Sequence, residues 1–109
     1  MMYYDVILKS KTSFLDRLFT YQYDENLEIG TRVIVPFGNA NSKNLGIIVA
    51  IHEGKIDFKT KKITQIIDVN PIISKELVEL AFYMIKNNIS DYGSAINTIL
   101  PPGSIDKVK

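Results

Sequence analysis

Lysine side chains are concentrated in one stretch of the sequence, between residues 39 and 63. This stretch holds five lysines and two acids, a net charge of +3, whereas residues 1–38 and 64–109 each carry −1. Clustered ammonium groups can bind phosphates, and the same pattern is also typical of a solvated surface loop. The lysines considered as phosphate contacts from this charge pattern are Lys43, Lys55, Lys59, Lys61 and Lys62.

Aromatic residues provide a second feature of the kind that binds unpaired bases. Phe19, Tyr21 and Tyr23 alternate with polar residues and therefore share one face of a strand. Phe37 lies in the turn Pro36–Gly38. In small barrels such aromatic faces stack on bases while nearby lysines hold phosphates, although the same spacing is also typical of a core. Within this set we expect Tyr21 and Phe37 to be partly exposed.

Motifs for catalysis are not found in the sequence. It holds no cysteine and a single histidine, His52, which excludes thiol chemistry, a disulfide framework and a multi-histidine metal site. Gly54-Lys55 is followed by Ile56, where a phosphate-binding loop needs Ser or Thr. We interpret His52 as a structural or solvated histidine and expect neither enzyme activity nor a cofactor in this chain.

The composition is that of one globular domain. The 109 residues are 46% hydrophobic and 23% charged with a net charge of +1, so any attraction to nucleic acid must come from a local patch. No apolar run approaches the ~20 residues that span a bilayer, and the start does not resemble a secretory signal. We therefore expect a cytoplasmic location and no membrane contact.

Hydrophobic periodicity predicts strands followed by helices. Alternating and β-branched runs predict five strands, at residues 4–9, 18–23, 31–35, 45–52 and 62–68. Ser74 is a candidate N-cap for a helix that ends near 87–88, and a second helix is expected from about Tyr92 to Pro101, with Ile96, Ile99 and Leu100 inward. The pattern predicts a mainly β fold, a small and partly open barrel with C-terminal helices packed on one side.

These elements divide the chain into a barrel at 1–70 and a helical segment at 74–100. We expect residues 1–103 to form one domain and residues 104–109 to be a linker.

Several motifs of the sequence resemble one known family. They are F-T-Y at 19–21, G-T-R-V-I-V-P-F-G at 30–38 and L-G-I-I-V at 45–49, and Lys61-Lys62-Ile63, Asp68-x-x-Pro71 and the Pro101 region also fit. Together they resemble the 3′-DNA-end-binding domain at the N-terminus of the bacterial replication-restart helicases (primosomal protein N′, PriA). The R-V-x-V-P-F-G element is the most specific of these motifs.

The resemblance implies an OB-like barrel that binds the 3′ end of the nascent leading strand at stalled replication forks for primosome assembly, without catalysis of its own. The pocket positions of the family match Phe19, Thr20, Tyr21, Gly38 and Lys61, and Lys43, Lys59 and Lys62 are further candidate phosphate contacts. ATP and zinc are implied only for the other parts of the full-length helicase, a winged-helix domain, helicase lobes and a zinc-binding region. The implied partners are DNA, those other domains, and single-stranded-DNA-binding and primosome proteins.

Thr20 departs from the family pattern, which has Asp at this position. A carboxylate accepts a charge-assisted hydrogen bond that is roughly twice as strong as a neutral one, so this change bears on how a terminal hydroxyl is bound. The alternative function is a small β-barrel protein-interaction domain with no role in nucleic-acid binding, in which the lysines are only solvated.

Overall fold

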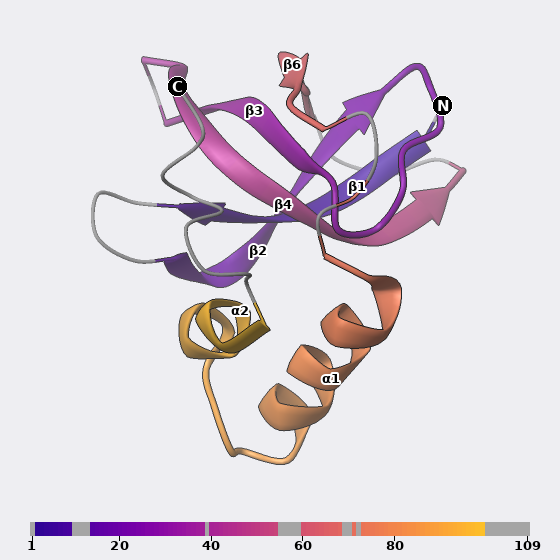
Figure 1. Cartoon of the computed structure of the whole chain (residues 1–109). Coiled ribbons are helices and arrows are strands. Elements are labelled where there is room, and N and C mark those ends of the chain that lie inside the picture. The colour runs from indigo at the N-terminus through magenta and orange to yellow at the C-terminus, as the bar shows by residue number, and fades with distance from the viewer. Residues whose placement is uncertain are drawn as a thin grey trace.

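The computed structural model describes residues 2–9, 14–38, 40–54, 60–68, 71 and 73–99. Its elements are β1 (Met2–Lys9), β2 (Phe14–Tyr23), β3 (Arg32–Phe37), β4 (Ser42–Glu53), β5 (Lys61–Lys62), β6 (Gln65–Ile66), α1 (Lys75–Lys86) and α2 (Tyr92–Ile99). The strands form one curled sheet, and both helices lie against the same side of it (Figure 1). The predicted mainly β fold with C-terminal helices is confirmed.

The strand order of the sheet is β5-β2-β1-β4-β3-β6, and the four long strands pair in antiparallel fashion. The prediction of a single strand at 62–68 is wrong, because the chain there forms two short strands on opposite edges of the sheet. Ile63 N–H donates to Gln22 of β2 (3.1 Å), and the next residue, Thr64, donates to Ile34 of β3 (2.8 Å). This segment therefore crosses from one edge to the other and gives the sheet its partly closed, OB-like curl.

Two hydrophobic clusters lie on the two faces of the curled sheet. Along β1, the alternation of side chains sends Tyr4, Val6 and Leu8 into the interior of the curl and Ile7 toward the helices. The interior cluster also contains buried residues of the other strands: Tyr21, Val33, Val35, Ile48 and Ile63. The curl is thus filled by side chains and leaves no room for a ligand among these described residues.

The helices are placed as their sequence signals predict. Ser74 caps α1, because its Oγ accepts a hydrogen bond from Leu77 N–H (3.2 Å). Ile96 and Ile99 of α2 are buried in the cluster beneath the sheet, whereas Leu100 and the predicted linker at 104–109 lie outside the described residues. None of the helices in the described part of the chain is long and apolar enough to cross a membrane.

Gly30 holds the turn before β3 against the start of α1. Its φ is +96°, and a Cβ placed there would lie 1.9 Å from the main-chain oxygen of Ile73. Only glycine combines this left-handed backbone with such a close approach. The G-x-R-V-x-V-P-F-G motif thus begins with a residue required by packing.

Candidate nucleic-acid interface

A pocket of about 380 Å³ lies at the edge of the barrel where β2, β5 and the turn after β3 meet. It is lined by Arg17, Leu18, Phe19, Thr20, Tyr21, Pro36, Phe37, Gly38, Thr60 and Lys61. All five pocket positions implied by the resemblance are therefore brought together at one site. Among the residues that the structure describes, the lining holds two cations and no carboxylate, so the pocket is suited to an anionic ligand.

Lys61 is positioned at this pocket by the parallel pairing of β5 with β2, in which it lies opposite Tyr21. Its side chain is exposed, and its Nζ donates a hydrogen bond to the Gly38 oxygen (2.9 Å). Gly38 has a φ of +78°, as the turn requires, and its oxygen also accepts from Asn41 N–H (3.1 Å). The ammonium group keeps further donors for a ligand at the mouth of the pocket.

Tyr21 is a core residue, which corrects the expectation that it is partly exposed. Only 4% of it is exposed, and its hydroxyl donates to the Pro36 oxygen (2.8 Å). Burial raises the pKa of Tyr21 to about 12, from an ordinary value near 10. Alternation along a strand shows which side chains share a face, but it does not show whether other segments of the chain cover that face. Tyr21 supports the pocket from below and offers little ring surface to a base.

Phe19 and Phe37 form an aromatic ridge along the pocket. Their ring centroids are 4.9 Å apart in an edge-to-face arrangement with an interplanar angle of 77°. Both side chains are partly buried, so the expected partial exposure of Phe37 is confirmed. The guanidinium carbon of Arg17 lies 4.7 Å from the centre of the Phe19 ring.

Arg17 was not identified from the sequence. The signal that could have found it is its spacing of two residues from Phe19, which places both side chains on the same face of β2.

Thr20 reaches the pocket from a strand position whose side chain is turned away from Phe19 and Tyr21. Its Oγ1 donates to Asp5 Oδ1 on β1 (2.7 Å), directly across the ladder. The other oxygen of Asp5 bonds to Nε2 of His52 (2.7 Å), and His52 is half exposed. The carboxylate separates the hydroxyl from the imidazole, so His52 does not serve Thr20 as a base. His52 is a structural partner of Asp5.

Of the other predicted lysines, the two that the structure describes do not line the pocket, and Lys55 lies outside the described residues. Lys43 is exposed on β4 opposite Pro36, and Lys62 is exposed beside Lys61, opposite Gln22. Lys59 lies outside the described residues. Across the described segments, no group of three His, Asp or Glu side chains is arranged as a metal site would need.

Arg32, within the most specific motif, is a structural residue rather than a second basic contact. Its Nη2 lies 2.7 Å from Asp68 Oδ1, its Nε lies 3.0 Å from Oδ2, and its main-chain N–H donates to Oδ2 (3.0 Å). Both side chains are nearly buried, with 11% and 7% exposed. This forked pair ties the start of β3 to the segment after β6 and explains why the motif needs arginine.

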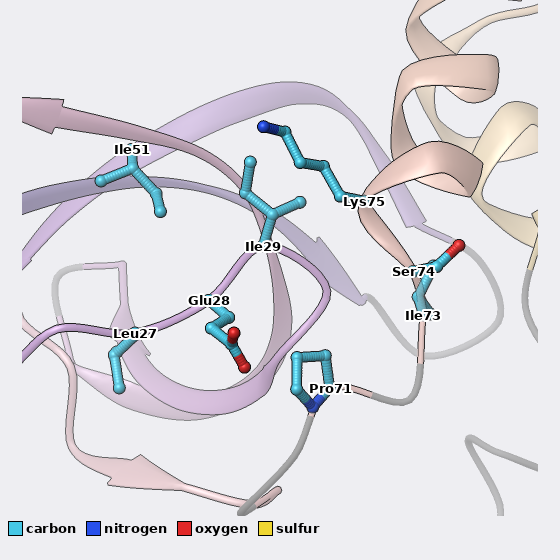
Figure 2. Close-up of a pocket in the computed structure, with 8 residues that line it drawn as sticks. All are labelled: Leu27, Glu28, Ile29, Ile51, Pro71, Ile73, Ser74 and Lys75. Carbon is cyan, nitrogen blue, oxygen red and sulfur yellow. The ribbon is translucent and has the colours of Figure 1, made fainter.

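A larger groove of about 630 Å³ lies where the turn before β3 faces the start of α1 (Figure 2). Its walls are mostly apolar, and Glu28 and Lys75 lie on different sides of Ile29. A further pocket beside Leu27 is lined by Glu25, Glu28 and Asp68. Each of these pockets contains a carboxylate, which leaves the β2–β5 pocket as the basic one of the three.

A curled, OB-like sheet with a basic, aromatic-lined pocket at its edge has the features of a nucleic-acid-binding domain. Comparison with known proteins agrees with this class. Residues 5–101 match the PriA 3′ DNA-binding domain (3′BD), and the chain belongs to this family. The replication restart protein PriA of Bacillus subtilis (strain 168) is 30% identical over 107 residues, 93% of this chain. The chain spans 13% of the length of that relative.

Proposed function

We propose that this chain is the DNA-binding module of a replication-restart protein and that its β2–β5 pocket holds the 3′-terminal nucleotide of a DNA strand. The observation that carries the proposal is the lining of this pocket, which combines Phe19, Phe37 and Gly38 with two cations and holds no carboxylate among its described residues. Membership in the 3′ DNA-binding domain family supports DNA as the ligand.

The main interaction with the DNA is expected to be electrostatic. Lys61, held beside Gly38, neutralises a phosphate near the strand end, and the exposed part of the Phe19 and Phe37 ridge contacts the sugar or base. Since Tyr21 is buried and Phe19 is partly covered, stacking contributes less than in an open aromatic platform. We therefore expect weak binding that depends strongly on salt and little on base sequence.

Recognition of an end depends on the shape of the pocket rather than on its charge. A 3′-phosphate adds negative charge, so two cations alone would favour it over a 3′-hydroxyl. We expect the turn Pro36–Gly38, which lines the pocket, to stop the strand there, so that a free 3′-hydroxyl is accepted and a 3′-phosphate is excluded. A preference for the hydroxyl is thus diagnostic of a closed pocket.

The larger protein supplies the remaining activities in this proposal. The module delivers the 3′ end of the nascent strand at a branched fork to the ATP-dependent helicase region, with the zinc-binding region and primosome or single-stranded-DNA-binding proteins as further partners. It works without catalysis of its own.

Fluorescence anisotropy with labelled oligonucleotides tests the proposal. We expect the domain to bind a single strand with a free 3′-hydroxyl more tightly than the same strand with a 3′-phosphate. Lys61→Ala should weaken binding of all sequences about equally and lower the slope of log K against log salt by about 0.7, the value of one single-strand phosphate contact. Lys62→Ala is the matched control, because it removes the same charge from the neighbouring position outside the pocket.

Equal affinity for both ends, with no effect of Lys61→Ala, would contradict the proposal. It would favour the alternative, a protein-interaction domain. The exposed apolar side chains of the helical layer, Leu80, Tyr83 and Ile89, which are 47%, 60% and 65% exposed, are the observation in favour of that function.

A further inference from the structure

The two cations of the pocket differ in their ion pairing from Arg32, the other arginine of the chain. Arg32 is paired with Asp68, whereas no carboxylate among the side chains that the structure describes lies at ion-pair distance from Arg17 or Lys61. An anionic ligand can therefore bind to them without first breaking an ion pair.

Arg17 is also held in one orientation. Its guanidinium lies over the Phe19 ring, and Phe19 is in turn packed edge-to-face against Phe37. Arg17 is an exposed residue, so its N–H groups can reach a ligand while the ring restricts the positions of the side chain. Such a pre-ordered fork suits a phosphate, because less rotamer freedom is lost when the ion pair forms.

The positions of the two cations in the sheet separate them along the pocket. Lys61 lies opposite Tyr21 in the β2–β5 ladder, and Arg17 lies four residues before Tyr21 in β2. Four residues of extended strand span about 13 Å between Cα atoms. Phe19, whose ring packs against Phe37, lies between positions 17 and 21 of β2, so the backbone positions of the two cations are separated along the strand.

We propose that Arg17 binds a second backbone phosphate of the DNA strand, upstream of the phosphate that Lys61 binds. The inference rests on the proposed function and extends it. Lys61 holds the terminal nucleotide, the chain then passes along the aromatic ridge, and Arg17 fixes the direction in which the strand leaves the pocket. The site therefore reads a short length of single strand rather than one nucleotide.

The test compares two free-3′-hydroxyl ligands, a thymidine dinucleotide with one phosphate and a thymidine pentanucleotide with four, by competition against a labelled strand. Arg17→Ala should weaken the pentanucleotide about fivefold, the upper range of an exposed ion pair, and leave the dinucleotide unchanged. Lys61→Ala should weaken both ligands. Lys86→Ala, which removes an exposed charge at the end of α1, is the control and should change neither.

Arg17→Lys separates charge from stacking. It should keep the salt slope of the pentanucleotide and lose about twofold in affinity, because lysine retains the charge but not the planar fork. Equal weakening of both ligands by Arg17→Ala would overturn the inference, since it would mean that Arg17 only supports Phe19. An unchanged pentanucleotide affinity, with Lys61→Ala still effective, would also overturn it and leave the proposed function intact. Failure of the wild-type domain to bind either ligand would instead refute the proposed function.

Discussion

Replacing Tyr21 with alanine is predicted to unfold the barrel before it reveals anything about DNA binding. Tyr21 is 4% exposed in the interior cluster, and its hydroxyl bonds to Pro36. Truncation of large buried aromatics costs about 3–5 kcal/mol, a large share of the 5–15 kcal/mol that holds a typical domain folded. With an m-value of about 2 kcal/mol/M, the midpoint of urea unfolding should fall by about 2 M.

Tyr21→Phe isolates the hydroxyl from the ring. It should cost about 1 kcal/mol at pH 8, because the ring still fills the core while the Pro36 oxygen loses its donor. Burial raises the pKa of Tyr21 to about 12, whereas the unfolded chain titrates near 10. The contribution of the neutral hydroxyl is therefore complete below pH 10 and is lost as the pH rises from 10 to 12. The wild type should lose its advantage over Tyr21→Phe in this window.

Urea unfolding of the wild type and both variants at pH 8, and of the wild type and Tyr21→Phe up to pH 11, measures these effects. The reasoning is refuted if Tyr21→Ala loses less than about 1 kcal/mol of unfolding free energy while DNA binding disappears. That result would place the ring in contact with the ligand. An advantage over Tyr21→Phe that is unchanged between pH 8 and 11 would contradict the raised pKa.

Two further predictions concern the neighbours of the pocket. Thr20→Asp puts a carboxylate directly opposite Asp5, so it should lower the free energy of unfolding by about 1 kcal/mol at pH 7 and leave the ratio of 3′-hydroxyl to 3′-phosphate binding unchanged. Thr20→Asn is the control for urea unfolding, and a sharpened binding ratio for Thr20→Asp would show that position 20 meets the strand end. Gly30→Ala should lower the free energy of unfolding by more than about 3 kcal/mol, because its Cβ would overlap the Ile73 oxygen. Gly54→Ala is the control, since Gly54 has a similar φ of +100° but open space around it, and it should cost about 1 kcal/mol. Equal losses in thermal or urea unfolding would contradict the packing argument.

Local signals in the sequence were sufficient for most of the elements, and the family pattern was sufficient for the grouping of the site. The β-branched, alternating runs formed strands, and Ser74 capped α1, because both depend on interactions within a few residues. The motif positions Phe19, Gly38 and Lys61 met at one pocket, since the family pattern contains long-range information that periodicity lacks. Splitting of the run at 62–68 was not predictable, because adjacent residues bond to opposite edges of the sheet.

The tertiary structure decided which of the aromatic and polar residues are free to meet a ligand. Alternation placed Tyr21 and Phe19 on one face, but only the curl of the sheet buried Tyr21 and left Phe19 at the rim beneath Arg17. Likewise, only strand pairing brought Asp5 opposite Thr20 and engaged the Thr20 hydroxyl in a hydrogen bond to that carboxylate. Sequence periodicity specifies the direction of a side chain relative to its own strand, whereas burial depends on which distant segments cover that face.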